Sequence, residues 1–206
     1  PRTYDTNNFD QTYLLWSWRN FWQYAENYPQ KLTILFNQLA KYLDTDPKLK
    51  IGIIIGSYRP EVLADPKRDG KEWLMSLSCM KEMISYSNRI ITFANLHWFE
   101  VLGLLRETKL IISPSESLGC PAYEAAAFGI PTILDRASNP FQDPNGNKFF
   151  EGIITAPKDI CPEFLEKLDI LFTNYSVYNA HGNAYREYVK TNATYEAYVK
   201  QLDYVI

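Results

Sequence analysis

The sequence is poor in cysteine, carries no excess of basic residues and contains no long hydrophobic run. Its three cysteines, Cys79, Cys120 and Cys161, stand far apart, with no Cys-x-x-Cys pair and no histidine at metal-ligand spacing. This pattern argues against a structural zinc site and a disulfide framework, and it favours free thiols in a reducing compartment. We therefore expect a cytoplasmic location and no bound metal.

Charge and hydropathy exclude two further classes of protein. The 206 residues contain 21 Lys and Arg against 24 Asp and Glu, a net charge of −3, which is not the basic footprint of a nucleic-acid-binding protein. Apolar runs such as 51–55 fall far short of the roughly 20 residues that a membrane helix needs, and no signal peptide is recognised. We expect neither a nucleic-acid partner nor a membrane span.

What remains is the composition of a globular protein, with 46% hydrophobic and 22% charged residues. These values are close to the averages for folded domains, and they argue against disorder and fibrous repeats. Aromatic residues gather near the N-terminus, at Trp16, Trp18, Phe21, Trp22 and Tyr24. This cluster belongs either to the core or to a surface that packs on a partner domain, and we favour the second interpretation.

Short apolar strands alternate with amphipathic helices along the chain. The β-branched and aromatic runs predict strands at 13–18, 50–56, 89–95, 109–113, 131–134 and 152–155. Apolar residues at helical spacing predict helices at 29–43, 73–84, 98–106, 121–128, 162–172 and 184–202. Helices between buried strands imply parallel βαβ units. We predict a single α/β domain over 1–206, built on a Rossmann-like, doubly wound parallel sheet.

The segment after the strand predicted at 109–113 carries most of the chemistry, because ligands bind beyond the carboxyl ends of such strands. Glu116 and Glu124 are separated by seven residues, with Gly119 and Pro121 between them. Gly119 allows close approach of the backbone to a ligand, and Pro121 suits the first helical position, so the positive helix end can face a diphosphate. Glu124, expected in the first turn, can accept hydrogen bonds from a ribose diol. Glu116 can bind hydroxyl groups of a second sugar.

A structural alternative applies to each glutamate alone. Acidic residues in a first helical turn are commonly there for their favourable interaction with the helix dipole, worth about 0.3–1 kcal/mol. Glu124 would then be a helix-stabilising residue, and Glu116 a solvated loop residue. The whole string, placed after a buried strand, favours the binding site.

The string resembles the Glu-x7-Glu signature of retaining glycosyltransferases of family four, which have the two-domain GT-B architecture. The positions that match the family pattern are Pro114, Ser115, Glu116, Gly119, Pro121, Glu124, Ala125, Gly129 and Pro131. Ser117 and Leu118 replace the Gly-Phe of the family. The resemblance covers nearly the whole chain and implies the C-terminal, donor-binding half of such an enzyme, with the N-terminal acceptor-binding domain absent from this chain.

The resemblance also implies roles for single residues. Glu124 would hold the ribose hydroxyls, and Glu116 would be the catalytic carboxylate that holds the transferred sugar. The backbone around Leu118 and Gly119 would contact the diphosphate or the sugar.

Candidates for the rest of the nucleotide come from other strand ends. Ala94 and Asn95 end a predicted strand and can approach the base through backbone atoms. His97 follows them and is expected to be a helix-start residue. We expect His181 to be exposed, because it lies in a polar stretch.

The family usually places a basic pair after its first strand to neutralise the diphosphate. Arg19 directly follows the strand predicted at 13–18, and Lys31 ends a Pro-Gln-Lys triplet similar to the family's Pro-Glu-Lys. The residues between them, 20–28, have no counterpart in the usual pattern. Arg19 and Lys31 are therefore either diphosphate ligands or solvated charges near a helix start.

The resemblance implies a metal-independent hexosyltransferase without a cofactor, whose donor substrate is a nucleoside diphosphate sugar. The intact enzyme would transfer the sugar, with retention, to a glycan or lipid-linked acceptor, and the isolated domain would bind donor without turnover. Peripheral membrane association is common in that family and would reside mainly in the other domain. Two alternatives stay open: a UDP-sugar epimerase or phosphorylase of the same architecture, and a non-catalytic, degenerate transferase domain.

Overall fold

The computed structural model describes residues 13–18, 25, 27–55, 70–94, 96, 98–113, 120–134 and 160–192. Its strands are β1 (Tyr13–Trp18), β2 (Lys50–Ile55), β3 (Ile90–Ala94), β4 (Thr108–Ser113) and β5 (Thr132–Leu134). They agree with the predicted strands to within one residue at each end. The strand predicted at 152–155 lies outside the described residues.

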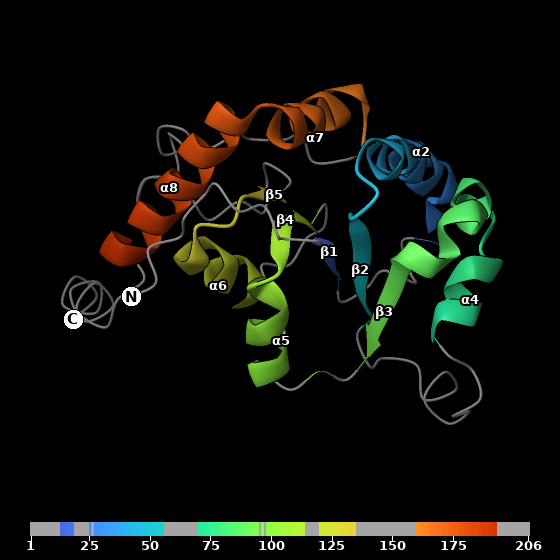
Figure 1. Cartoon of the computed structure of the whole chain (residues 1–206), viewed down its shortest axis with the longest axis horizontal. Coiled ribbons are helices and arrows are strands. Elements are labelled where there is room, and N and C mark those ends of the chain that lie inside the picture. The colour runs from blue at the N-terminus through green and yellow to red at the C-terminus, as the bar shows by residue number, and fades with distance from the viewer. Residues whose placement is uncertain are drawn as a thin grey trace.

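All neighbouring strands pair in parallel, in the order β3-β2-β1-β4-β5. The chain moves outward from β1 to β3, then returns to the other side of β1 to form β4 and β5 (Figure 1). Trp16 of β1 is opposite Ile53 of β2 and Ile112 of β4. This reversal between β1 and β4 is the topological switch point of a doubly wound fold.

Neighbouring residues of β4 show that both faces of the sheet are covered. Leu110 and Ile112 belong to one buried cluster, together with residues of α2 (Pro29–Thr45) and α7 (Pro162–Thr173). Ile111, between them, belongs to another cluster with residues of α5 (Trp98–Leu105) and α6 (Cys120–Phe128). Because side chains alternate along a strand, α2 and α7 cover one face and α5 and α6 the other.

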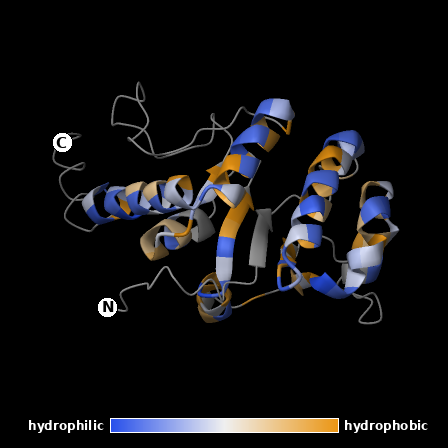
Figure 2. Ribbon diagram, turned by 45° about the horizontal axis from the view of Figure 1, so that its top comes forward, coloured by the Kyte–Doolittle hydropathy of each residue, from blue (hydrophilic) through white to orange (hydrophobic). Residues whose placement is uncertain are grey.

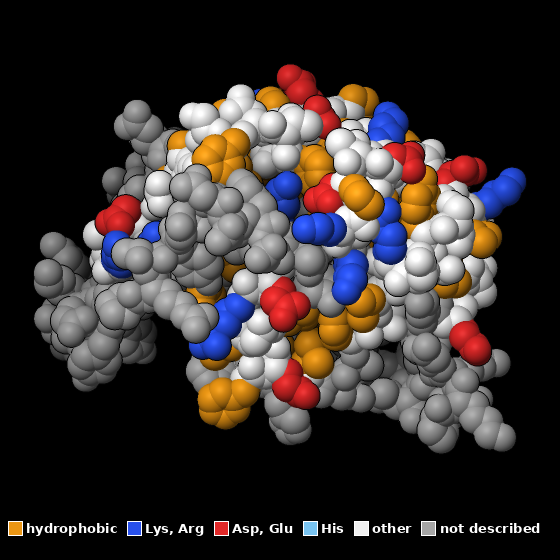
Figure 3. Space-filling model, in the orientation of Figure 1, with side chains coloured by type: hydrophobic (Ala, Val, Ile, Leu, Met, Phe, Trp, Pro, Cys, Tyr) orange, Lys and Arg blue, Asp and Glu red, His pale blue; other side chains and the backbone are white. Residues whose placement is uncertain are grey.

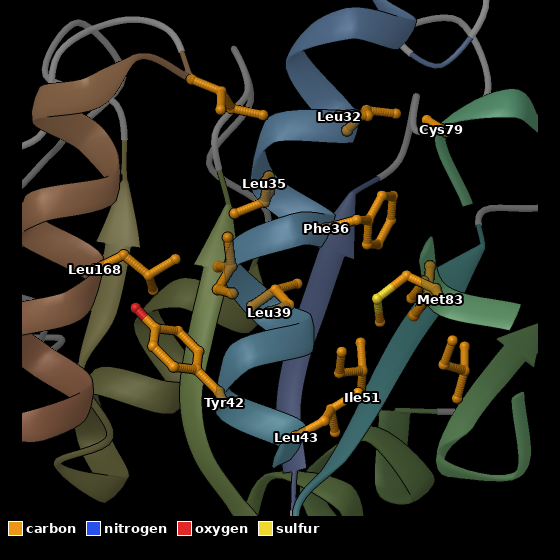
Figure 4. Close-up of a cluster of buried hydrophobic side chains, with 14 of the residues drawn as sticks. Leu32, Leu35, Phe36, Leu39, Tyr42, Leu43, Ile51, Cys79, Met83 and Leu168 are labelled. Atoms are coloured by element: carbon orange, nitrogen blue, oxygen red, sulfur yellow. The ribbon is translucent and has the colours of Figure 1, made fainter. Parts of the chain in front are cut away.

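The helix α2 forms as the sequence predicts. Pro29 occupies the start of the helix, where its missing N–H costs no hydrogen bond. The buried side chains of α2 are Leu32, Leu35, Phe36, Leu39, Tyr42 and Leu43. In Figure 4, Tyr42 points toward Leu168 of α7, whereas Leu32 and Phe36 lie toward Cys79 and Met83 of η1 (Ser78–Arg89). Each buried side chain contributes about 1.5–3 kcal/mol by leaving water. Figure 2 shows the resulting stripes of hydrophobic and hydrophilic residues on the helices.

Polar contacts join α2 to α7, although the two helices are far apart in sequence. One carboxylate oxygen of Asp169 accepts hydrogen bonds from Gln38 Nε2 and from the Tyr42 hydroxyl, each at 3.2 Å. The rings of Tyr42 and Phe172 stack with their centres 4.0 Å apart. These contacts fix α7 beside α2 on the same face of the sheet.

The continuous helix predicted at 73–84 is wrong. The structure has α4 (Gly70–Ser76), then Leu77 in an extended conformation, then the 3-10 helix η1 (Ser78–Arg89). Ser76 and Ser78 flank the break, and serine competes for helical hydrogen bonds through its own hydroxyl. Within η1, Cys79, Met80 and Met83 are nevertheless buried against α2.

The last helix starts earlier than predicted. Instead of beginning at 184, α8 (Tyr175–Asn192) starts one residue after α7, separated from it by Asn174. Residues beyond 192, which the predicted helix included, lie outside the described residues. Among the helices that the structure describes, none is both long and apolar enough to span a membrane.

Candidate functional site

The switch point brings the carboxyl ends of β1 and β4 side by side. β1 ends at Trp18 and β4 at Ser113, and the paired strands run in the same direction. In sequence, Arg19 follows the first of these ends and 114–119 follow the second. Arg19, and with it Glu116, Leu118 and Gly119, lies outside the described residues, so the roles given to these four remain predictions.

Glu124 is the predicted site residue that the structure describes best. It lies on α6, the helix that leads away from the carboxyl end of β4, and its side chain is half-buried. The prediction that it stands in the first turn is wrong, because α6 already begins at Cys120 and has no acidic residue in its first turn. The carboxylate therefore lies further from the positive helix end, whose influence falls off within the first turn.

Lys31 lies near the start of α2, which follows β1 and so begins at the same edge of the sheet. Its side chain is half-buried, and its ammonium group is 4.8 Å from the centre of the Tyr28 ring. A cation over the face of an aromatic ring is attracted by the quadrupole of the ring. The structure thus places a lysine at the expected edge, and its contact with a diphosphate remains a prediction.

Ala94 is the last residue of β3, and its partner across the ladder is Ile55, the last residue of β2. Its backbone therefore lies at the carboxyl edge, two strands away from β1. Asn95 and His97 lie outside the described residues. A contact of this strand end with a base remains a prediction.

His181 is buried, so the prediction that it is exposed is wrong. Its ring packs edge-on against Tyr185, with the ring centres 4.4 Å apart. Burial lowers the pKa of His181 from 6.5 to about 4, and a backbone hydrogen bond at Thr132 opposes this shift in part. Thr132 begins β5, so the histidine lies toward the amino edge of the sheet, away from the switch-point ends. It is a structural residue.

The sequence did not reveal how α8 is attached. The Tyr178 hydroxyl donates to the Lys109 carbonyl at 2.6 Å, and the Tyr185 hydroxyl donates to the Thr132 carbonyl at 2.6 Å. Lys109 and Thr132 lie at the beginnings of β4 and β5, so α8 crosses the amino ends of these strands. The spacing of Tyr178, His181 and Tyr185 was a signal for a helix with one buried face.

Charged side chains of both signs occur throughout the part of the chain that the structure describes. Within that part, no three His, Cys, Asp or Glu side chains gather as metal ligands would. On the face shown in Figure 3, acidic and basic side chains lie next to one another rather than in a patch of one sign.

The comparisons with known proteins concern the fold. The sequence matches no protein-family model, and no curated protein matches it. The C-terminal domain of a group 1 family glycosyl transferase from Francisella tularensis is similar in structure, with a TM-score of 0.59 and 16% identity over 89% of this chain and 87% of that one.

Longer proteins resemble the chain over part of their length. Sucrose-phosphate synthase from Thermosynechococcus elongatus gives a TM-score of 0.59 with 18% identity, over 96% of this chain and 45% of that one. UDP-GlcNAc 2-epimerase from Neisseria meningitidis, bound to UDP-GlcNAc, gives 0.51 with 14% identity, over 88% of this chain and 44% of that one. This chain thus spans less than half of either protein. Together with the strand order, these likenesses show a Rossmann-like, doubly wound α/β fold, that of one half of the GT-B glycosyltransferase architecture.

Proposed function

We propose that this chain is the nucleotide-sugar-binding domain of a retaining glycosyltransferase of the family-four type. The observation that carries the proposal is the position of the Glu-x7-Glu segment. It follows β4 in sequence and continues into α6, and β4 lies beside β1 at the switch point of the sheet. Crevices at switch points are where doubly wound sheets bind nucleotides. The solved structures of similar fold include an epimerase bound to UDP-GlcNAc, which supports a nucleotide-sugar ligand.

In the proposal, residues near different strand ends bind different parts of the donor substrate. Glu124 binds the ribose hydroxyls, and Glu116 binds the transferred sugar as the catalytic carboxylate. Arg19 and Lys31 bind the diphosphate, Arg19 as a bidentate donor and Lys31 as a point charge. Backbone groups of Leu118 and Gly119 contact the diphosphate or sugar. The backbone at Ala94 and Asn95 contacts the base.

In the proposed reaction, the bond between the anomeric carbon of a hexose and the diphosphate breaks, a new bond forms to an acceptor hydroxyl oxygen, and the proton of that hydroxyl passes to the leaving diphosphate. Negative charge develops on the leaving diphosphate. Fixed cationic groups and N–H dipoles that meet this charge lower the barrier, and this is commonly the largest contribution to such catalysis. No metal or cofactor has a part in the proposal.

We place the acceptor site outside this chain, in a second domain of the intact enzyme. The acceptor would be a glycan or a lipid-linked saccharide, in the cytoplasm or at the cytoplasmic face of a membrane. The chain spans 45% of sucrose-phosphate synthase, which leaves room for such a domain in proteins of this fold. We expect donor binding without turnover by residues 1–206 alone.

Calorimetry with UDP-, GDP- and ADP-sugars tests the donor site directly. We expect one base to be preferred, and Glu124→Ala to weaken its binding by roughly 10- to 100-fold, because a hydrogen-bonding carboxylate is lost from the ribose. Wild-type protein that binds none of these sugars, or binds one as well after Glu124→Ala, would contradict the proposal.

An epimerase is the second candidate, because UDP-GlcNAc 2-epimerase shares the fold. Incubation of the natural full-length protein with UDP-GlcNAc, followed by proton NMR, separates the two reactions. Epimerised UDP-sugar formed without any acceptor would favour the epimerase. Transfer to an added acceptor would favour the transferase, and it would also exclude a non-catalytic domain.

A further inference from the structure

The contacts between α8 and the end of α6 point to a residue that positions Glu124, the side chain proposed to bind the ribose. We infer that Arg186, on α8, holds α6 in the register that places Glu124 in the donor site. This inference rests on the proposed function. Arg186 contacts the C-terminal end of α6 and acts on Glu124 through that helix.

The helix α6 ends in a compact turn. Gly129 has a positive φ of 72°, its N–H donates to the Ala126 carbonyl at 2.8 Å, and the Ile130 N–H donates to the Ala125 carbonyl at 2.9 Å. This is the Schellman pattern, which satisfies some of the last carbonyls of a helix but not all of them. The Phe128 carbonyl accepts a hydrogen bond from Nη2 of Arg186 at 3.0 Å. The guanidinium thus adds a donor and a positive charge at the negative end of α6.

Two other residues of α8 contact the same turn and the strand that follows it. Gly182 lies so close that a Cβ there would be 2.2 Å from the Gly129 carbonyl oxygen. The Tyr185 hydroxyl donates to the Thr132 carbonyl at 2.6 Å. Arg186 therefore projects from a helix that is itself fixed to the sheet, and its guanidinium lies over Gly129.

Several contacts set the position of α6. Among the α6 side chains whose burial the structure describes, those of Ala125 and Ala126 are fully buried. Alanine has no long side chain to interlock with a neighbour, so the position of α6 along its axis depends on further contacts. These include the partly buried side chains of Tyr123 and Phe128, which pack against buried clusters, and the cap from Arg186.

The link from the cap to the site is short. Glu124 precedes Phe128 by about one helical turn, or roughly 6 Å along the axis. A movement of the capped end is passed to Glu124 through a single turn of helix. Displacements of about 1 Å in groups that orient a substrate can cost around 100-fold in rate. Arg186 is thus a positioning residue, with no contact to the donor required.

The test compares Arg186→Met, Arg186→Lys and Lys190→Met in the chain of 206 residues. Methionine keeps an unbranched apolar stem and removes the donors and the charge, whereas lysine keeps the charge and donors at one nitrogen. Lys190 is the matched control: it is a cation on the same helix, its side chain is 60% exposed, and it forms a salt bridge of 2.6 Å with Glu187 on α8 itself.

The decisive readout is the preference for ribose. Calorimetry gives the affinities for the best-bound of UDP, GDP and ADP and for its 2′-deoxy counterpart. We expect wild type to prefer the ribonucleotide by roughly 10- to 100-fold, as one hydrogen bond to a carboxylate implies. Arg186→Met is expected to reduce this preference at least about threefold, Arg186→Lys to restore part of it, and Lys190→Met to leave it unchanged. A general loss of stability would not alter this ratio in protein that is still folded.

Amide hydrogen exchange over 120–128 measures how firmly α6 is held. We expect faster exchange in Arg186→Met and unchanged exchange in Lys190→Met. An unchanged ribose preference in Arg186→Met, or unchanged exchange, overturns the positioning role while donor binding stands. Wild-type protein that binds none of the nucleotides overturns the proposed function as well, so the two failures are distinguishable. Nucleotide binding without any ribose preference overturns the role of Glu124, and the positioning role with it.

Discussion

Gly182 of α8 lies against the turn that ends α6. A Cβ at this position would lie 2.2 Å from the carbonyl oxygen of Gly129 and 3.2 Å from its carbonyl carbon. Because backbone atoms cannot move aside cheaply, we predict that Gly182→Ala lowers the free energy of unfolding by about 1–3 kcal/mol, as overpacking does elsewhere. Urea unfolding followed by circular dichroism measures this change.

Gly103 provides the control for this prediction. It also lies within a helix, α5, but a Cβ there would meet nothing within 4 Å. Gly103→Ala is therefore expected to stabilise the chain by about 0.5–1 kcal/mol, the usual gain for this change in a helix. If both variants shift stability in the same direction, the close contact of Gly182 is not what limits that position.

His181 should make stability depend on pH in the acidic range. Its pKa is about 4 in the folded chain because of burial, against 6.5 when unfolded. Between these values the unfolded state binds more protons, so stability rises with pH and is lost as the pH falls from 6.5 toward 4. The loss from this group amounts to about 3 kcal/mol.

A comparison with His181→Gln isolates this contribution, since carboxylates that titrate near pH 4 are common to both proteins. Urea unfolding at intervals from pH 4 to pH 7.5 should show a steeper decline for wild type than for the variant. Parallel curves for the two proteins would mean that the buried ring does not govern the acid response.

At the scale of elements, the side chain of Arg89 forms hydrogen bonds with the backbone at the end of α2. Arg89, the last residue of η1, donates from Nη1 to the Leu43 carbonyl at 2.7 Å and from Nε to the Leu49 carbonyl at 2.8 Å. Its Nη2 donates to the Asp46 carbonyl. These carbonyls lie in the last turn of α2 and in the connection to β2, where the helix itself provides no partners. Arg89 thus joins η1 to α2 through hydrogen bonds as well as through the apolar contacts of the core.

We predict that Arg89→Met lowers the free energy of unfolding by about 2–3 kcal/mol, because the carbonyls lose their hydrogen bonds with Arg89, although that of Asp46 keeps the Leu49 N–H as a donor. Arg89→Lys should recover part of the loss, since one ammonium group cannot reach all of the carbonyls in the same geometry. Lys81→Met is the control, as Lys81 is an exposed cation on η1. It should change stability by less than about 0.5 kcal/mol. Equal effects of Arg89→Met and Lys81→Met in chemical denaturation would contradict this account.

Sequence patterns predicted those elements whose stability is decided locally. α2 has Pro29 at its start and apolar residues at helical spacing, and α6 ends where Gly129 takes a positive φ, so both were predicted within two residues at each end. α8 was predicted to start too late, because Gly182 and its polar neighbours resemble a loop. The contact of Gly182 with the backbone of Gly129 explains the glycine, and that contact is a tertiary feature that the local sequence does not contain.

In the candidate site, too, some residues could be predicted from local sequence and others depend on tertiary contacts. The segment from Glu116 to Glu124 could be singled out because its residue types and spacing carry chemistry by themselves. Arg186 could not, because its importance comes from the Phe128 carbonyl, which reaches it only when α6 and α8 pack together. The first-turn position predicted for Glu124 also failed, since the helix begins at Cys120 and no residue type marks that start.

At the scale of the whole molecule, the predicted parallel sheet follows from right-handed crossovers between buried strands. The side of β1 on which β4 lies is decided by which face of the sheet each helix covers, and this depends on packing between distant segments. Leu110 and Ile111, adjacent in sequence, belong to different cores because helices from both halves of the chain cover the two faces. The switch point, and with it the proposed site, is therefore a product of the complete fold.

Because the proposed site is assembled by the complete fold, a bound donor should stabilise the whole domain. A ligand at 100 times its Kd adds about 2.7 kcal/mol to the free energy of unfolding, and in a domain of this size each kcal/mol raises Tm by about 2–4 °C. We predict that the best-bound nucleoside diphosphate sugar raises Tm by about 5–10 °C at that concentration. Differential scanning calorimetry of wild type and Glu124→Gln, each with and without ligand, measures the shift. Since Glu124→Gln weakens binding, it should reduce the shift at the same ligand concentration; an undiminished shift would place the nucleotide away from α6.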